Sequence, residues 1–443
     1  MYMNFMDKIE EKLLPIASTI SRNKFLISLR DGMTLAMPLL IVGSFFTLIG
    51  NFPIKAWTNF LSNTSINGVT LSSILSIPSQ VTVSIMAIFI VYGIGMNFAK
   101  QEGINPSSGG ITSLVTWFLL MPFVTSFTPD DSIVKLLPSD SVPFSVSSIP
   151  LDWVGAKGIF IGIICAFTSV LLYKWVVDKG WTIKMPEGVP PTVSQSFSDL
   201  IPLVIVIVTF LIVRVIFVFT PWGDPFTFVY TILQLPLQNI GDSLGAMLLV
   251  YFIAHVLWFF GIHGTNVTDS VFNPILLVLS TENQVAVQAG LAPTHIINQQ
   301  FQNLFGTFGG GGSTLSLLIA MMLFCKSKRI TQLSKLAILP GIFGINEPVI
   351  FGLPIVLNPT IAIPFIATPL INIIISWVTM YIGLVPITNG TLLPWTTPPI
   401  LSGFLASGWQ GSILQIFLII LGVFIYLPFI KTIDKEYLAE ENA

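Results

Sequence analysis

Long apolar runs with few charged residues recur along the whole chain. A bilayer core of about 30 Å is crossed by about 20 helical residues. Together with the apolar but broken stretches between them, the runs predict an all-α integral membrane protein with about ten transmembrane helices. The runs cover residues 33–50, 81–99, 111–127, 158–177, 201–222, 246–260, 315–325, 360–384 and 413–430.

Charged residues are rare, and their placement predicts an orientation. Of the 443 residues, 53% are hydrophobic and 9% are charged, whereas soluble domains carry about 25% charged residues. By the positive-inside rule, we expect both termini in the cytoplasm and an even number of spans. Lysines and arginines gather before the first apolar run, at Lys100 and within 174–184, 326–335 and 431–435, and the loops on the other side keep Lys55, Lys135 and Lys157.

Several classes of protein are excluded by composition and motif. Residues 1–30 mix charged and apolar side chains, which favours an interfacial helix over a cleaved signal peptide. The net charge of -2, without a basic block, argues against a nucleic-acid partner. Cys165 and Cys325 form no metal-binding pattern, and the glycine run at 308–313 lacks the lysine of a phosphate-binding loop. We expect no metal and no cofactor.

A polar, proline-bearing segment divides the chain. Residues 181–200 are predicted to form a cytoplasmic linker between an N-terminal transmembrane bundle, 1–180, and a C-terminal transmembrane domain, 201–443. The residues that could carry chemistry fall in the C-terminal domain. We therefore expect that domain to bind the substrate.

The segment 339–359 reads LPGIFGINEPVIFGLPIVLNP and is apolar, yet it holds four prolines and three glycines. Such a density of helix breakers at membrane depth predicts a re-entrant hairpin. Glu347 is its one charged residue, and Pro348 biases Glu347 away from helical geometry. An intramembrane carboxylate indicates a functional site, here a general base. A structural ion pair with Arg214 or a lysine is the alternative.

His263 follows an apolar run in the string GIHG, and Thr265 and Asn266 add short polar groups beside it. An imidazole at that place could donate a hydrogen bond to a substrate hydroxyl. A histidine that caps a helix end is an equal alternative. His255 lies on an apolar stretch and is interpreted as a packing residue, and His295 receives no role.

Two tryptophans could pack against a sugar. Trp258 stands five residues before His263, and Trp395 lies in the proline-broken string PWTTPPI. Flat aromatic faces pack on the apolar faces of pyranose rings. A place in the core or in the membrane-interface belt is the alternative for each.

The strings GIHG (261–264), GINEPVIFGLPIVLNP (344–359) and MPEGVPPTVSQSFSDLIP (185–202) carry a resemblance over nearly the whole chain. The sequence resembles the sugar-transporting IIC component of the bacterial phosphotransferase system, in the branch of lactose, cellobiose and N,N′-diacetylchitobiose permeases. The resemblance implies ten spans, two re-entrant hairpins in the C-terminal half, a homodimer formed by the N-terminal bundle, and a place in the bacterial cytoplasmic membrane.

The resemblance also implies a mechanism. Such a protein, the membrane-embedded part of a sugar phosphotransferase, imports a disaccharide and presents its 6-hydroxyl to a phosphocysteine on a IIB protein, which IIA and HPr supply. Glu347 and His263 match the catalytic pair of the family. Asn346 matches its asparagine, and Trp258 and Trp395 match sugar-packing aromatic residues. Thr265 and Asn266 are further substrate-binding candidates.

Two other functions stay open on the residues alone. One is an ion-coupled secondary sugar transporter in which Glu347 carries the proton, and the other is a channel or scaffold without chemistry. Because neither cysteine lies in a polar loop that could cradle phosphate, we expect the phosphocysteine to come from a separate chain.

Overall fold

The structure is a computed structural model that describes residues 22–52, 54–127, 144–353, 355–356 and 358–442. It divides into two compact units. The N-terminal unit comprises residues 28–39 and 80–236, and the C-terminal unit comprises the described parts of 1–27, 40–79 and 237–443. The interfacial helix expected over residues 1–30 lies largely outside the described residues.

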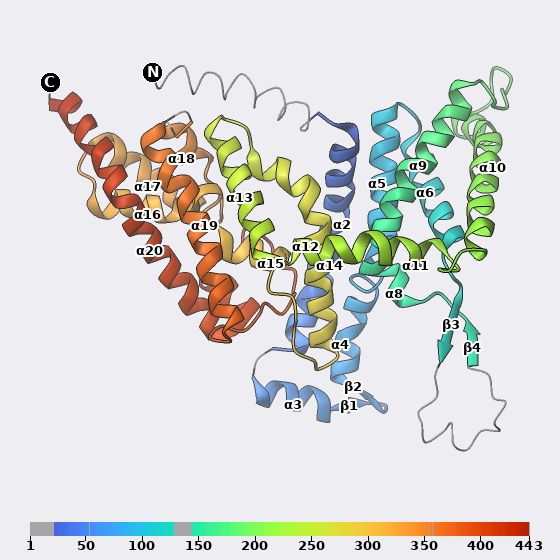
Figure 1. The fold of residues 1–443 in the computed structure, drawn as a ribbon, viewed down its shortest axis with the longest axis horizontal. Coiled ribbons are helices and arrows are strands. Elements are labelled where there is room, and N and C mark those ends of the chain that lie inside the picture. Colours follow the sequence, from blue (N-terminus) through green and yellow to red (C-terminus); the bar gives the residue numbers. More distant parts are fainter. Residues whose placement is uncertain (1–21, 53, 128–143, 354, 357, 443) are drawn as a thin grey trace. The chain divides into compact units, whose positions relative to one another are not determined.

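The N-terminal unit is built on a bundle of α5, α6 and α9, against which α10 packs (Figure 1). Small residues let these helices approach closely: a Cβ placed on Gly95 would lie 2.0 Å from the Ser113 hydroxyl. Its elements are part of α2 (Lys24–Gly50), α5 (Met86–Glu102), α6 (Pro106–Leu120), β3 (Val124–Phe127), β4 (Phe144–Ser147), α8 (Leu151–Val154), η1 (Ala156–Gly158), α9 (Ile159–Asp178), α10 (Pro191–Val218), α11 (Pro225–Val229) and the π-helical η2 (Tyr230–Gln234).

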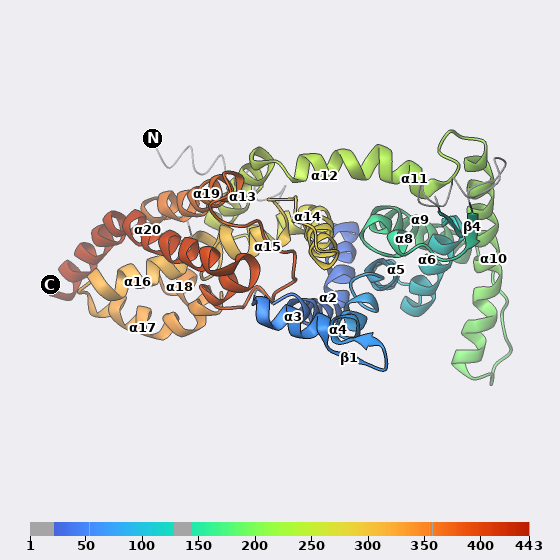
Figure 2. The ribbon, with the colours of Figure 1, turned by 90° about the horizontal axis from the view of Figure 1, so that it is seen from below.

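The C-terminal unit packs α16 between α17 and α20 (Figure 2), while α13 packs on α14 and α19. It also contains the rest of α2. Its other elements are α3 (Lys55–Asn63), β1 (Ser65–Ile66), β2 (Val69–Thr70), α4 (Leu71–Gln80), α12 (Leu235–Gly241), α13 (Leu244–Phe259), α14 (Gly264–Gln288), α15 (Gln299–Phe301), the π-helical η3 (Gln302–Gly306), η4 (Gly311–Ser313), α16 (Thr314–Phe324), α17 (Lys328–Ile342), α18 (Glu347–Gly352), α19 (Pro359–Tyr381) and α20 (Leu401–Asn442).

The predicted class, an all-α membrane protein, is confirmed. Among the described residues, 6 helices are long and apolar enough to cross a membrane, or 7 if the pair α11–α12 and α13, bent by 74°, counts as one. The count of ten spans stays a prediction. The strands add two short antiparallel pairs, β1 with β2 and β3 with β4.

Helix α10 begins at Pro191, inside the segment expected to be a linker, and packs on α6 and α9. Asp199 of α10 explains part of that packing. Its carboxylate accepts hydrogen bonds from Ser108 (2.5 Å), Tyr173 (2.5 Å) and Gln195 (2.6 Å). The division into a dimer-contact bundle and a substrate-binding domain stays a prediction. Arg214, also on α10, donates to the Leu120 carbonyl oxygen at 3.1 Å.

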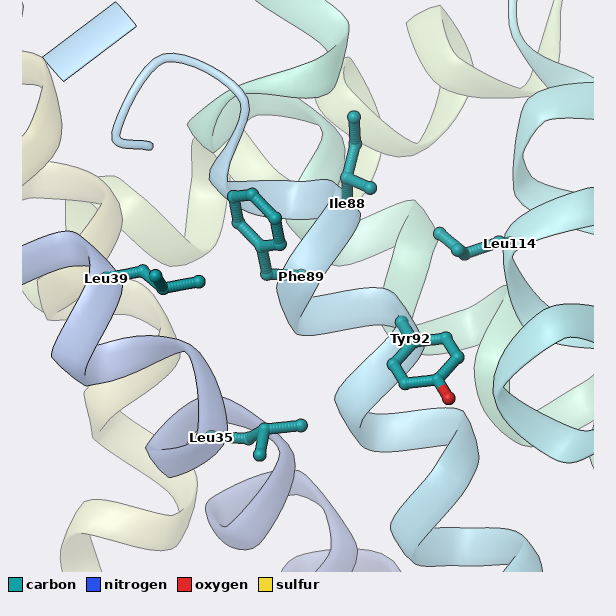
Figure 3. Close-up of a pocket in the computed structure, with 6 residues that line it drawn as sticks. All are labelled: Leu35, Leu39, Ile88, Phe89, Tyr92 and Leu114. Atoms are coloured by element: carbon teal, nitrogen blue, oxygen red, sulfur yellow. The ribbon is translucent and has the colours of Figure 1, made fainter. Parts of the chain in front are cut away.

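A pocket in the N-terminal unit is lined almost wholly by aliphatic and aromatic carbon (Figure 3). Sugar recognition needs hydrogen-bonding groups placed around the ligand. The Tyr92 hydroxyl is the single side-chain polar group of this lining, so the pocket does not fit a sugar. It is lined by Leu35, Leu39, Ile88, Phe89, Tyr92 and Leu114.

His295, which received no role from the sequence, lies between two carboxylates of the C-terminal unit. Its Nδ1 is 2.9 Å from Asp242, in the bend between α12 and α13, and its Nε2 is 3.0 Å from Glu282 on α14. Burial opposes the charged imidazole, but the hydrogen bonds to Asp242 and Glu282 outweigh burial and raise the pKa of His295 to about 9. The cation therefore holds the bend, α14 and the following loop together.

Replacing His295 with Ala should lower the melting temperature of the purified protein, because two carboxylates lose their shared partner. Since the folded pKa is about 9 and the ordinary value is about 6.5, this stabilisation is complete below the ordinary value and is lost as pH rises through the folded one. The difference from the unmodified protein should shrink between roughly pH 6 and pH 10. Thermal unfolding in detergent across that range measures it.

The control is Lys174→Ala, which breaks a surface pair with Asp178 and should change the melting temperature little. A His295→Ala protein as stable as the unmodified one at neutral pH, or a difference that grows with pH, would contradict the assignment.

Candidate functional site

The segment that the sequence predicted to be broken is broken. Helix α17 ends at Ile342, Gly344 takes a φ of 84°, and α18 begins at Glu347. The expectation that Pro348 keeps Glu347 out of helical geometry is wrong, because Pro348 occupies the first turn of α18, where proline is tolerated. Glu347 is the first residue of α18, and its side chain is exposed.

Glu347 makes no salt bridge within the part of the chain that the structure describes. The ion pair considered as the alternative role therefore finds no support there. Arg214, the proposed partner, uses its guanidinium on a backbone carbonyl. As far as the described residues are concerned, the carboxylate can therefore accept a proton or a hydrogen bond from another molecule.

Asn346 ties this turn to the glycine run. It is buried, and its Nδ2 donates to the Gly311 carbonyl oxygen at 2.9 Å. Gly310 has a φ of 88°, and a Cβ placed on it would lie 2.7 Å from the Asn346 Cγ. The glycines are therefore required both for the backbone conformation and for the approach of Asn346.

Trp258 lies on the other side of the glycine run. It is 7% exposed, and a Cβ placed on Gly311 would lie 3.1 Å from its Nε1. The Nε1 atom is buried and has no hydrogen-bond partner among the described residues. The ring centroids of Trp258 and His263 are 4.3 Å apart, with the planes inclined by 47°. The two residues thus form one aromatic wall.

His263 is the N-cap of α14, and its hydrogen bonds fix its tautomer. The Asn266 backbone N–H donates to His263 Nδ1 at 3.3 Å, and the Thr265 hydroxyl lies 3.1 Å from the same nitrogen. Nδ1 is therefore an acceptor in the neutral ring, and Nε2 carries the hydrogen. Gly264 is needed here, because a Cβ on it would lie 1.8 Å from the Ala254 carbonyl oxygen.

His263 therefore does cap a helix, as the alternative interpretation proposed, and it does so through Nδ1. Its Nε2–H is not used by the cap and can donate a hydrogen bond to another molecule. The Thr265 hydroxyl and the Asn266 backbone N–H position His263, and the substrate-binding role expected of these two residues stays a prediction. Desolvation lowers the pKa of His263, while its own backbone and the nearby Glu347 carboxylate act in the opposite direction. A neutral donor and a carboxylate acceptor therefore stand within electrostatic reach of each other.

Trp395 and His255, the other two residues that the sequence singled out in this domain, occupy different surroundings. Trp395 is 59% exposed, and its ring packs against the turn before α18, since a Cβ on Gly344 would lie 3.1 Å from it. His255 is fully buried beside Tyr251 and Phe365, and its Nδ1 donates to the Tyr251 carbonyl oxygen at 2.7 Å. His255 therefore packs as expected, although its Nε2 has no partner among the described residues.

The structure brings together Glu347, Asn346, His263 and Trp258 around the glycine run, with Trp395 on the adjoining turn. Sequence reasoning did not include Gly310 and Gly311 among the site residues. Their signal was the FGGGGS string itself, a run of glycines in an apolar region, and Gly309, Gly310 and Gly312 do take positive φ angles. Together these residues offer a proton acceptor, a hydrogen-bond donor and flat aromatic surface.

Comparison with known proteins gives the family. The family described as "Phosphotransferase system, EIIC" matches residues 30–369. The chain is 39% identical to the lichenan permease IIC component of Bacillus subtilis (strain 168), over 99% of this chain and 96% of that one. It is 36% identical to the cellobiose-specific EIIC component of Geobacillus stearothermophilus, also over 99% and 96%.

A solved structure agrees over nearly the whole length. The crystal structure of ChbC, the IIC component from the N,N′-diacetylchitobiose-specific phosphotransferase system, matches with a TM-score of 0.93 and 38% identity. The match covers 98% of this chain and 99% of ChbC. The resemblance read from the sequence is confirmed. This chain belongs to the phosphotransferase system EIIC family.

Proposed function

We propose that the chain imports a disaccharide of the cellobiose, diacetylchitobiose or lactose type and presents its 6-hydroxyl to the phosphocysteine of a IIB protein. The observation that carries this proposal is the exposed carboxylate of Glu347, unpaired among the described residues and beside the neutral donor His263, in an EIIC chain. The names of the relatives and of ChbC support the substrate class.

In the proposed reaction, Glu347 removes the proton of the 6-hydroxyl as its oxygen attacks the phosphorus atom of the phosphocysteine. The phosphorus–sulfur bond breaks, and the cysteine leaves as a thiolate. His263 Nε2–H donates to the same sugar oxygen and orients it. Because positioning and electrostatics supply most of the catalysis in phosphoryl transfer, the rigid holding of both groups matters as much as their acidity.

Asn346 would act by fixing the turn that carries Glu347, and Trp258 and Trp395 would pack on the sugar rings. The phosphoryl donor would be a separate IIB chain, charged through IIA and HPr. The burial of both Cys165 and Cys325 supports this, because a phosphocysteine must reach solvent. Residues 201–443 would bind substrate and residues 1–180 would form a homodimer contact in the bacterial membrane, with both termini cytoplasmic.

The chemical fate of the transported sugar tests this function. Vesicles that contain the purified chain should accumulate cellobiose as a phosphorylated product when phosphorylated IIB is enclosed, and mass spectrometry of the contents detects it. Without IIB, phosphorylated sugar should be absent. Accumulation of unmodified cellobiose driven by an ion gradient would instead indicate secondary transport.

Glu347→Gln should keep sugar binding and lose phosphoryl transfer, because the amide still forms hydrogen bonds but cannot accept the proton. The loss should be roughly 10²–10⁴-fold in rate, measured as phosphorylated sugar formed per minute with phosphorylated IIB in excess. Glu187→Gln, the same change at an exposed loop residue, is the control. Near-normal transfer by Glu347→Gln would refute the general-base role.

His263→Ala should weaken cellobiose binding about 5- to 30-fold, the value of one or two hydrogen bonds, and should slow transfer. His255→Ala should lower the melting temperature while cellobiose affinity stays near normal, because His255 is buried in packing. Binding by titration calorimetry and thermal unfolding separate the two effects. The opposite pattern would mean that the wrong histidine was assigned.

A further inference from the structure

Beyond its cap, helix α14 continues as a polar stripe. Asn266, Asp269 and Asn273 recur at spacings of three and four, which places them on one face of the helix. Six residues of helix separate His263 from Asp269, which corresponds to about 9 Å along the axis. The stripe therefore leads along the helix away from the proposed catalytic pair.

Two glutamines, one on α15 and one on η3, form hydrogen bonds with residues of this stripe. Gln302 Nε2 donates to Asp269 Oδ1 at 2.8 Å, and Gln299 Nε2 donates to Asn273 Oδ1 at 2.5 Å. Gln302 is held in place by its backbone, whose carbonyl oxygen accepts from the Tyr251 hydroxyl at 2.8 Å. It also begins the π-helical turn η3, and single π-helical turns are frequent at functional sites.

Both glutamines leave an oxygen without a donor. Gln299 is 3% exposed and Gln302 is 5% exposed, and the Oε1 atom of each is buried and unpartnered among the described residues. The orientation of Gln302 is fixed, because a carboxylate can only accept and must therefore face the Nε2 side of the amide. A buried acceptor without a partner is unfavourable, so a donor from another molecule would stabilise this oxygen.

Asp269 adds a second unused acceptor next to this one. Its side chain is partly exposed, and within the described residues no group donates to its Oδ2. Asp269 Oδ2 and Gln302 Oε1 thus present acceptors alone. The natural complement is a pair of hydroxyl hydrogens, and hydrogen bonds to a carboxylate are among the stronger ones.

We propose that Asp269 and Gln302 bind the sugar ring that is not phosphorylated, by accepting its hydroxyl hydrogens. They are then specificity-determining residues, which distinguish a disaccharide from a single sugar. This inference rests on the proposed function, since it requires that a disaccharide occupy the site beside Glu347 and His263.

The test uses the purified full-length chain in detergent, with titration of cellobiose and of its single-deoxy derivatives in the ring that is not phosphorylated. For the unmodified protein, removal of a contacted hydroxyl should weaken binding about 10-fold or more. Asp269→Asn should weaken cellobiose binding about 10- to 100-fold. The affinity of this variant should not fall further when the contacted hydroxyl is removed from the sugar. If Asp269 had only a structural role, the variant would still bind the deoxy sugar more weakly than cellobiose.

Glu282→Gln is the matched control, because Glu282 is another α14 carboxylate that accepts from a glutamine, Gln238, at 3.1 Å. It should keep the full response to the deoxy sugar. Gln302→Leu is the second test variant, used if Asp269→Asn does not fold, and it should also lose the response.

The outcomes separate the two proposals. If the unmodified chain binds none of cellobiose, diacetylchitobiose and lactose, the proposed function fails and this inference fails with it. If it binds cellobiose, but Asp269→Asn and Gln302→Leu respond to every deoxy sugar as the unmodified chain does, only this inference is overturned, and the unpartnered oxygens are then satisfied by water.

Discussion

The hydrogen bond from Asn346 Nδ2 to the Gly311 carbonyl oxygen joins two stretches of irregular backbone in an apolar region. Irregular backbone is tolerated in a membrane where protein or a wet cavity satisfies its polar groups. Here the Asn346 side chain satisfies a backbone carbonyl oxygen of the glycine run. The position of Glu347, one residue after Asn346, depends on this bond, and so does the space in which Trp258 and His263 lie.

Elsewhere in the C-terminal unit, which has a large apolar core, neutral polar side chains also join neighbouring helices. Gln284 Nε2 donates to the Thr47 hydroxyl at 3.0 Å, and Gln288 Nε2 reaches Thr47 and Ser79, both at 2.8 Å. Amide and hydroxyl pairs cross-link helices without the large penalty of placing charges in lipid. Charged groups occur at particular places, such as the cation of His295 and the Glu347 carboxylate, which is unpaired among the described residues.

The fold class and most of the site could be predicted because their signals are local. A carboxylate among prolines and glycines, or a histidine between glycines, stands out within a few residues of sequence. The ion pairs of His295 with Asp242 and Glu282 could not be predicted, because Asp242 lies 53 residues away in the sequence and becomes adjacent only after folding. The same holds for Asp269 and Gln302, and for the use of His263 as a cap, which depends on where α14 begins. The helix start at Glu347 was missed because proline is compatible with a first turn.

Because Glu347 has no cationic partner within the described residues, the proposed reaction has an electrostatic direction. A neutral sugar meets one negative charge at the site and is not repelled by it. Once phosphorylated, the same sugar carries about two negative charges near neutral pH beside a carboxyl group that can lose its proton again to water. In the proposed reaction, repulsion between like charges would then favour departure of the product and oppose its return, so the charge on the phosphorylated sugar would make import one-way.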